Sequence, residues 1–242
     1  THALRSFSEA KGYRGIDDVL AGRPEVHIAR RLGRDLRRQL LDERNRQGSG
    51  ATSFFVTSAK SKTGNLGGLA GADQICQKLA SAVGLGSKTW RAYLSAERDP
   101  DTNKPADAAS RIGKGPWVNA KGATVAKDLA ELHARKGDAD VFLDERGERV
   151  PGQWPESPKP NEHDILTGST ADGKVLPGKT CNDWTSDSKD IAAQVGHSDG
   201  LGPGGDPSGR YASWNSSHDS QSCADTSPRG GAGRFYCFAR TE

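Results

Sequence analysis

Hydrophobic residues follow a helical period in the first fifty residues and a different pattern afterwards. Between Glu25 and Gln47, isoleucine and leucine recur at every fourth position, which places them on one side of a helix. This stripe consists of Ile28, Leu32, Leu36 and Leu40. Gly48 to Gly50 then ends the pattern. The sequence therefore predicts an α-helical N-terminal arm within residues 1–50.

From residue 51 onward, short hydrophobic runs typical of strands are mixed with two helical segments. The helical patterns run from Ala72 to Gly84 and, more weakly, from Val125 to Ala134. The strand-like runs cover residues 53–57, 90–95, 141–144, 165–167 and 234–239. Residues 186–210 are mostly Gly, Ser, Asp and Pro, which is typical of a long surface loop. We therefore expect residues 51–242 to form an α+β domain.

The composition indicates a small core with long connections. Only 33% of the residues are hydrophobic, and the chain contains 30 Gly and 12 Pro. The net charge of +3 comes from 34 basic and 31 acidic residues, which gives no reason to expect a nucleic-acid partner. No run approaches the roughly 20 apolar residues that cross a bilayer, so no transmembrane segment is expected.

The four cysteines predict a disulfide framework, because an even set of this kind is typical of exported proteins. Three pairings are open. Joining Cys76 to Cys237 would tie the two ends of the domain together and leave Cys181 with Cys223. The chain begins at Thr1 without a secretory signal. Together these features favour a processed protein that is secreted or extracytoplasmic, in the periplasm, at the cell surface or in an extracellular matrix.

Several segments, in the same order, resemble endostatin, the C-terminal domain of collagens XV and XVIII. They are residues 71–76, 80–85, 90–95, 116–119, 141–144, 166–169, 181–184, 222–223 and 236–238. The pattern is also similar to exported bacterial lectin-like domains of unassigned function. The resemblance covers residues 51–242 and implies a C-type lectin-like fold with two nested disulfides.

The resemblance implies no metal or other cofactor for this chain. Lectin calcium sites use a Glu-Pro-Asn or Gln-Pro-Asp tripeptide and a Trp-Asn-Asp, whereas this chain has Lys159 and Ser216 where carboxylates are needed. Endostatin holds zinc with histidines at the start of its domain, and no histidine cluster precedes Phe54. Of endostatin's heparin-binding arginines, only Arg91 falls on a matching motif, so heparin binding is not carried over.

Three histidines lie beside aspartates, a combination that can bind a transition metal or act as a general base. The pairs are His163 with Asp164, His197 with Asp199, and His218 with Asp219. They lack the tight, repeated spacing of a zinc ligand set, so we interpret them as polar loop residues. A Gly-x-Ser-x-Gly elbow is also missing, and we expect no catalytic residues and no enzymatic activity.

Ligand binding is instead expected in the loop-rich half of the domain, residues 144–220. Two tryptophans lie near Cys181 and Cys223, and an exposed indole face can stack on a sugar ring or a partner side chain. The candidate ligand-binding residues are Trp184, Trp214, Asn215, His218 and Asp219. We therefore expect a non-enzymatic, exported binding module that recognises a glycan or a protein.

The N-terminal arm has three interpretations: packing on its own domain, docking into a partner or another copy, and attraction to an anionic surface. We favour docking, through the hydrophobic stripe and the arginines beside it. These arginines include Arg30, Arg34, Arg37 and Arg38. An alternative function follows, in which the chain is a structural accessory subunit of a larger envelope or surface complex and docks mainly through this arm.

Overall fold

The computed structural model describes residues 51–240. The predicted N-terminal arm, with its hydrophobic stripe and its arginines, lies outside the described residues and stays a prediction. Within residues 51–240, no helix is long and apolar enough to cross a membrane. The described part is an α+β structure, as the sequence predicts.

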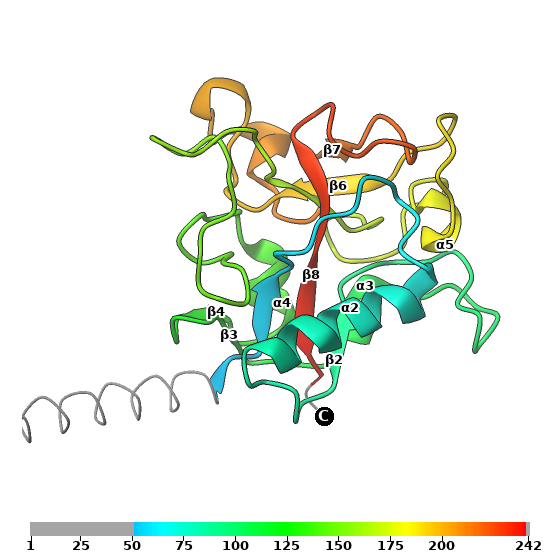
Figure 1. Ribbon diagram of the computed structural model, residues 1–242, viewed down its shortest axis with the longest axis horizontal. Helices are drawn as coiled ribbons and strands as arrows, with labels where there is room; N and C mark the ends of the chain where they lie inside the picture. Colours follow the sequence, from blue (N-terminus) through cyan, green and yellow to red (C-terminus); the bar gives the residue numbers. More distant parts are fainter. Residues whose placement is uncertain (1–50, 241–242) are drawn as a thin grey trace, which may run out of the picture. The chain divides into compact units, whose positions relative to one another are not determined.

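Six strands form the main sheet, in the order β1-β8-β5-β6-β7, with β2 also paired to β8. The strands are β1 (Phe54–Val56), β2 (Trp90–Ala92), β5 (Asp164–Leu166), β6 (Gln194–His197), β7 (His218–Asp219) and β8 (Gly231–Ala239). Strands β1 and β2 run antiparallel to β8, whereas β5 runs parallel to it. Strands β6 and β7 extend the sheet beyond β5 in antiparallel pairs. Figure 1 shows β8 at the centre of the fold.

Strand β8 separates two hydrophobic clusters, because alternate residues of a strand point to opposite faces. Phe235 and Cys237 belong to one cluster, whereas Tyr236 and Phe238 belong to the other. Helix α2 (Gly68–Ala82) packs on the first face through residues such as Leu69. The second cluster is rich in aromatic rings that meet edge-on or stacked. The sheet is therefore covered on both sides.

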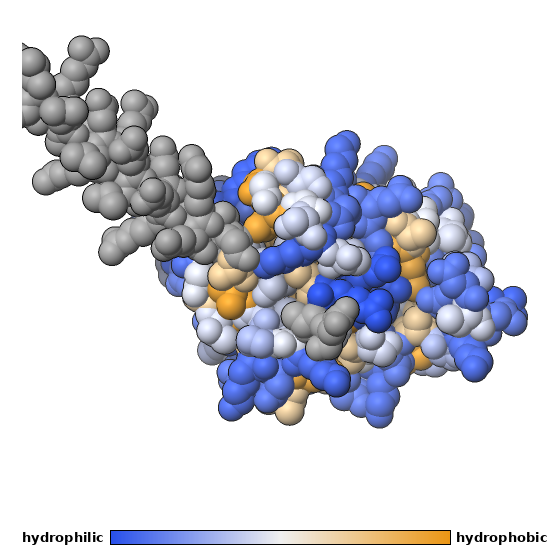
Figure 2. All heavy atoms as spheres, turned by 90° about the horizontal axis from the view of Figure 1, so that it is seen from below, coloured by the Kyte–Doolittle hydropathy of each residue, from blue (hydrophilic) through white to orange (hydrophobic). Residues whose placement is uncertain are grey.

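The remaining elements are short and surround this sheet. They are α3 (Ala108–Arg111), β3 (Trp117–Val118), β4 (Thr124–Ala126), α4 (Leu129–Ala134), α5 (Cys181–Trp184) and two 3-10 turns, η2 (Pro203–Gly205) and η3 (Gly209–Ala212). Strands β3 and β4 form a separate antiparallel pair. On the face in Figure 2, hydrophilic side chains dominate and hydrophobic ones are scattered.

Two disulfides form, and the pairing is nested. Cys76 on α2 bonds to Cys237 on β8, with Cα atoms 5.6 Å apart. Cys181 bonds to Cys223 within that loop, with Cα atoms 5.7 Å apart. The first bond ties the helix to the central strand, and the second closes the loop-rich half of the domain.

The structure corrects the predicted helix over residues 125–134. Its first residues belong to β4, which pairs with β3, and the helix begins only at Leu129. Asp128 sets this boundary because its side chain accepts a hydrogen bond from the backbone N–H of Glu131, as a helix N-cap does.

Two further predictions were wrong in part. Residues 141–144 form no strand and make only isolated bridges, Val56 with Asp144 and Leu143 with Arg149. The predicted surface loop over residues 186–210 contains β6, which lies fully buried between β5 and β7. The sequence of β6, Gln-Val-Gly-His, has little hydrophobic character, so the usual strand pattern is missing there.

Candidate metal centre

Three neighbouring strands bring acidic and imidazole side chains to one place. Asp164 on β5 is paired directly with His197 on β6, and His218 on β7 is paired with Val195. Val195 and His197 are two positions apart and so share a face of the sheet, which places His218 beside His197. His163 immediately precedes β5. A β-bulge between Asp164 and Ile165 shifts the register with β8, and bulges of this kind redirect side chains.

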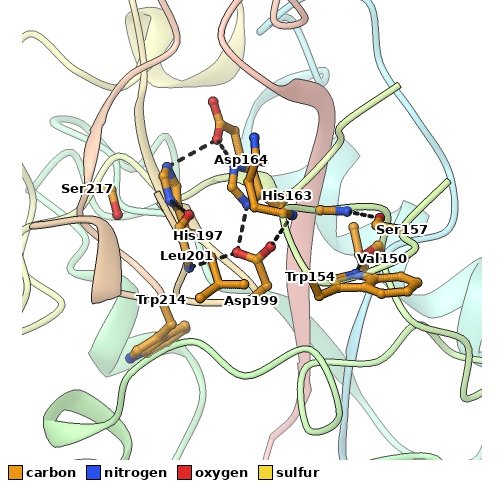
Figure 3. Close-up of polar contacts among 12 residues, drawn as sticks. Val150, Trp154, Ser157, His163, Asp164, His197, Asp199, Leu201, Trp214 and Ser217 are labelled. Atoms are coloured by element: carbon orange, nitrogen blue, oxygen red, sulfur yellow. Dashed lines mark hydrogen bonds and ion pairs between the residues drawn. The ribbon is translucent and has the colours of Figure 1, made fainter. Parts of the chain in front are cut away.

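The Asp164 carboxylate lies at the centre of this group. Its Oδ1 is 3.3 Å from Nε2 of His163 and 3.3 Å from Nε2 of His197 (Figure 3). Its Oδ2 is 3.6 Å from Nε2 of His218, and the Nε2 atoms of His197 and His218 are 2.9 Å apart. His163, Asp164 and His197 offer ligand atoms that all lie within 4.8 Å of one another.

Asp164 is 1% exposed, and neither of its carboxylate oxygens accepts a hydrogen bond from any described residue. Burying a carboxylate without hydrogen-bond partners disfavours its charged form. This burial raises the pKa of Asp164 to about 7, although the neighbouring His163 acts in the opposite direction. Burial therefore outweighs the neighbouring histidine, and the charged form of the carboxylate is disfavoured.

Each of the three imidazoles is held by its other ring nitrogen. Nδ1 of His163 lies 2.7 Å from Oδ1 of Asp199. Nδ1 of His197 lies 2.7 Å from the backbone oxygen of Leu201, and Nδ1 of His218 lies 2.9 Å from that of Asp219. Figure 3 shows Asp199 and Leu201 on the far side of the imidazoles from Asp164.

Electrostatics keep these groups in defined protonation states. Burial alone would raise the pKa of Asp199, but the hydrogen bonds from His163 and from backbone N–H groups lower it, so Asp199 is charged. Burial lowers the pKa of His197 to about 3, and it also lowers the pKa of His218. These two imidazoles are therefore neutral at physiological pH.

A cavity of about 360 Å³ opens beside this cluster. His163, His197 and His218 form part of its wall, and the other lining residues are Gln153, Pro203, Arg210, Tyr211 and Arg229. The ring of Tyr211 stacks on His197 with centroids 5.6 Å apart, and the guanidinium of Arg210 lies 5.1 Å from the centre of the Tyr211 ring. The wall therefore combines imidazole, phenol and guanidinium groups.

The structure corrects the prediction that Trp184, Trp214 and Asn215 contact a ligand, because all three are buried in the core. The indole N–H of Trp184 donates to the backbone oxygen of Ser95, and that of Trp214 donates to Leu132. Figure 3 shows Trp214 apart from the imidazole cluster. Neither indole face is available to stack on a ligand.

The other two candidates lie at the cavity or beside it. The side chain of His218 is 15% exposed and lines the cavity. Asp219 instead pairs with Lys179 and Arg229. Trp214 and His218, four residues apart in the sequence, therefore have different surroundings.

Sequence reasoning missed His163, Asp164, His197 and Asp199 as site residues. The interpretation of these pairs as polar loop residues was wrong in part: His163 and Asp199 do lie outside the strands, but all four side chains are buried and linked by close contacts. The available signal was the repetition of a His-Asp pair at three places in the chain. Spacing along the chain concealed it, because the contacts arise from the pairing of β5, β6 and β7.

The fold and the site define a disulfide-bonded α+β domain with a buried histidine–aspartate cluster beside a cationic cavity. Residues 59–200 match the family described as "Protein of unknown function (DUF1554)", and the chain belongs to that family. The match includes Asp164, His197 and Asp199 and ends before His218. No curated protein matches the chain.

Proposed function

We propose that this protein is a non-enzymatic, exported binding module that takes an acidic saccharide into the cavity beside the histidine–aspartate cluster. The observation that carries the proposal is the cationic cavity wall. Arg210 and Arg229 line it, Arg229 being paired with Asp219, and no carboxylate is among the described residues that line the cavity. Guanidinium groups bind carboxylate and sulfate oxygens through paired N–H donors, so an acidic sugar suits this wall.

A saccharide fits better than a protein partner. The cavity of about 360 Å³ is of the size that small-molecule sites have. A specific protein interface needs roughly 800 Å² on each partner, usually with an apolar or aromatic centre. Among the described residues, Ile191 is the large hydrophobic side chain that stands exposed. The mainly hydrophilic face in Figure 2 agrees with this.

The wall also favours binding over catalysis. Hydrolytic sites need a group that accepts a proton near neutral pH, usually a histidine or a carboxylate. The histidines of this wall face Asp164 through Nε2 and use Nδ1 for Asp199 or backbone oxygens. The other described lining residues, such as Gln153 and Arg210, are not bases at that pH.

We also propose that the fold is of the endostatin-like, C-type lectin-like kind. Two nested disulfides, a cysteine on the first helix of the domain and a cysteine on its last strand support this. The disulfides equally support an oxidising compartment outside the cytoplasm.

A saccharide array with the full chain tests the proposal. We expect uronic-acid and sulfated saccharides to bind and neutral ones of the same size to give background signals. Arg210→Ala should lower the affinity at least about tenfold, which is the loss of one charged hydrogen bond. The exposed Arg98, which is not among the cavity-lining residues, provides a matched control as Arg98→Ala. Equal binding of neutral and acidic saccharides, or equal losses in both variants, would contradict the proposal.

A further inference from the structure

The hydrogen bonds of His197 and His218 fix where their protons lie. A backbone oxygen only accepts hydrogen bonds, so Nδ1 of His197 must donate to Leu201, and Nδ1 of His218 must donate to Asp219. Nε2 is therefore the ring nitrogen that each histidine directs into the cluster, and the two Nε2 atoms lie 2.9 Å apart. Two N–H groups cannot point at each other over this distance, so at least one Nε2 carries a lone pair.

The third imidazole, that of His163, also directs Nδ1 away from the cluster and Nε2 into it. The charged carboxylate of Asp199 accepts a hydrogen bond from Nδ1 of His163 over 2.7 Å, which leaves Nε2 of His163 as the ring nitrogen that faces the cluster. This Nε2 points at Asp164, which receives no hydrogen bond from the described residues. Three ring nitrogens and a buried carboxylate thus meet in one place, and no hydrogen bond from the described residues reaches the carboxylate.

A cation among the four groups would be the partner that the buried carboxylate lacks. We propose that the Nε2 atoms of His163, His197 and His218 and the carboxylate of Asp164 bind one divalent first-row transition metal ion, with zinc as the best match. This inference does not depend on the saccharide proposal.

The separations suit a metal of this size. Zinc bonds to imidazole nitrogen and carboxylate oxygen at about 2.0–2.1 Å, so neighbouring ligands of a tetrahedral site lie about 3.3 Å apart. The distances from Asp164 Oδ1 to His163 and His197 are both 3.3 Å, and that from Oδ2 to His218 is 3.6 Å. The His197 to His218 distance of 2.9 Å is shorter than this and must widen when the ion enters.

The surroundings of the ligands also resemble a metal site. Histidine ligands in metalloproteins usually donate their other N–H to a carboxylate or a backbone oxygen, which orients the ring and fixes its tautomer. All three histidines do so here. A set of three nitrogen ligands and one oxygen ligand favours zinc. Calcium and magnesium instead select sites made of oxygen ligands.

Four protein ligands make a closed set, which is typical of a structural zinc site. A single metal ion would link His163, just before β5, to ligands on the three neighbouring strands β5, β6 and β7. It would also offset the negative charges of Asp164 and Asp199 close to the wall that Arg210 and Arg229 line. The metal would therefore have a structural role and make the surroundings of the cavity less negative.

Metal analysis and thermal melting of the full chain test this inference. The purified protein should retain about one zinc ion per chain after dialysis against metal-free buffer. Chelator-treated protein should regain thermal stability with added zinc, by about 5 to 10 °C at a hundredfold excess of free zinc over Kd. Cobalt in place of zinc should give the intense visible absorption of a tetrahedral nitrogen–oxygen site.

Variants separate a metal site from a merely structural cluster. Asp164→Asn keeps the shape of the side chain, removes the buried charge and supplies an N–H for Nε2 of a histidine. In the presence of chelator, the Asp164→Asn variant should melt at the same temperature as the wild type or at a higher one. Its melting temperature should not rise when zinc is added. The melting temperature of His197→Gln should not rise with zinc either. His133→Gln is the matched control, because His133 is half-buried beside Tyr93, outside the proposed metal site. This variant should still bind about one zinc ion per chain.

Three results would overturn the inference. They are a chain that retains no zinc and shows no zinc-dependent stabilisation, an Asp164→Asn variant that binds zinc as the wild type does, and a His133→Gln variant that loses zinc equally. Zinc binding without saccharide binding would leave this inference standing and contradict the proposed function alone.

Discussion

Asp164 and His197 face each other across the antiparallel pair of β5 and β6, with Oδ1 of one 3.3 Å from Nε2 of the other. The preceding residue on β6 is Gly196, and a Cβ there would lie 1.9 Å from the backbone oxygen of Trp214. A glycine at this position lets β6 approach the neighbouring backbone closely. The site geometry therefore depends on a residue with no side chain.

We predict that Gly196→Ala lowers the free energy of unfolding by about 1–3 kcal/mol or more, because the added methyl group overlaps a backbone atom that is not free to move. Gly84→Ala is the control, since a Cβ at Gly84 meets nothing within 4 Å. Gly84 has a φ of 81°, so its replacement should cost about 1 kcal/mol from backbone strain alone. Urea denaturation measures both values, and equal losses would contradict the steric explanation.

The two disulfides should contribute unequally to stability. Cys76 and Cys237 are 161 residues apart, whereas Cys181 and Cys223 are 42 apart. Restriction of the unfolded chain predicts losses of about 5 and about 4 kcal/mol when each bond is removed singly by a pair of Cys→Ala changes. Denaturant titration of the two double variants measures the losses. A larger loss for the shorter loop would show that native packing, not chain entropy, sets the order.

Trp214→Phe should weaken the fold without acting on a ligand directly. The indole N–H of Trp214 donates to Leu132 over 2.9 Å, and its ring packs on Tyr236 with centroids 5.0 Å apart. The Leu132 oxygen keeps its hydrogen bond from the backbone N–H of Arg135, so loss of the indole donor should cost about 0.5–1.5 kcal/mol. Thermal melting measures this loss, and saccharide binding below the melting range should stay within about twofold of the wild type. A large loss of affinity in fully folded protein would restore Trp214 as a binding residue.

Glu162 should make the protein sensitive to acid. Burial alone would raise the pKa of Glu162, but hydrogen bonds from Lys60 and Arg234 lower it below the ordinary 4.5. The side chains of Glu162 and Arg234 are 5% and 8% exposed, so removing one partner leaves a buried charge, at a cost of about 3–5 kcal/mol.

Because the folded-state pKa of Glu162 is depressed, this stabilisation is complete above pH 4.5 and is lost as the pH falls through the lowered pKa. Glu162→Gln should therefore unfold more readily than the wild type at pH 7, and the difference should shrink toward acid pH. The free energies of unfolding of the variant and the wild type, compared between pH 7 and pH 3, measure this difference. Lys60→Gln should have a smaller effect, because the Lys60 side chain is 54% exposed. A pH-independent difference would exclude titration of Glu162 as the cause.

The elements that the sequence predicts well are those in which hydrophobic residues dominate. The helix with Cys76 and the strand with Cys237 are clear from local pattern, and the structure confirms them. The even number of cysteines likewise indicates disulfides before their partners are known. Strand β6 was missed because a buried polar strand has no hydrophobic alternation.

The amino-acid sequence thus determined the α+β class, the main helix and the central strand, because these depend on hydrophobic patterns between near neighbours. Tertiary structure alone decided which residues meet at the site. His163, His197 and His218 are widely separated in the chain, and only the order β5-β6-β7 brings their Nε2 atoms to Asp164. Tertiary structure likewise decided that Trp184 and Trp214 are buried. Burial of a large aromatic ring depends on the residues that pack around it, and here those residues come from distant parts of the chain.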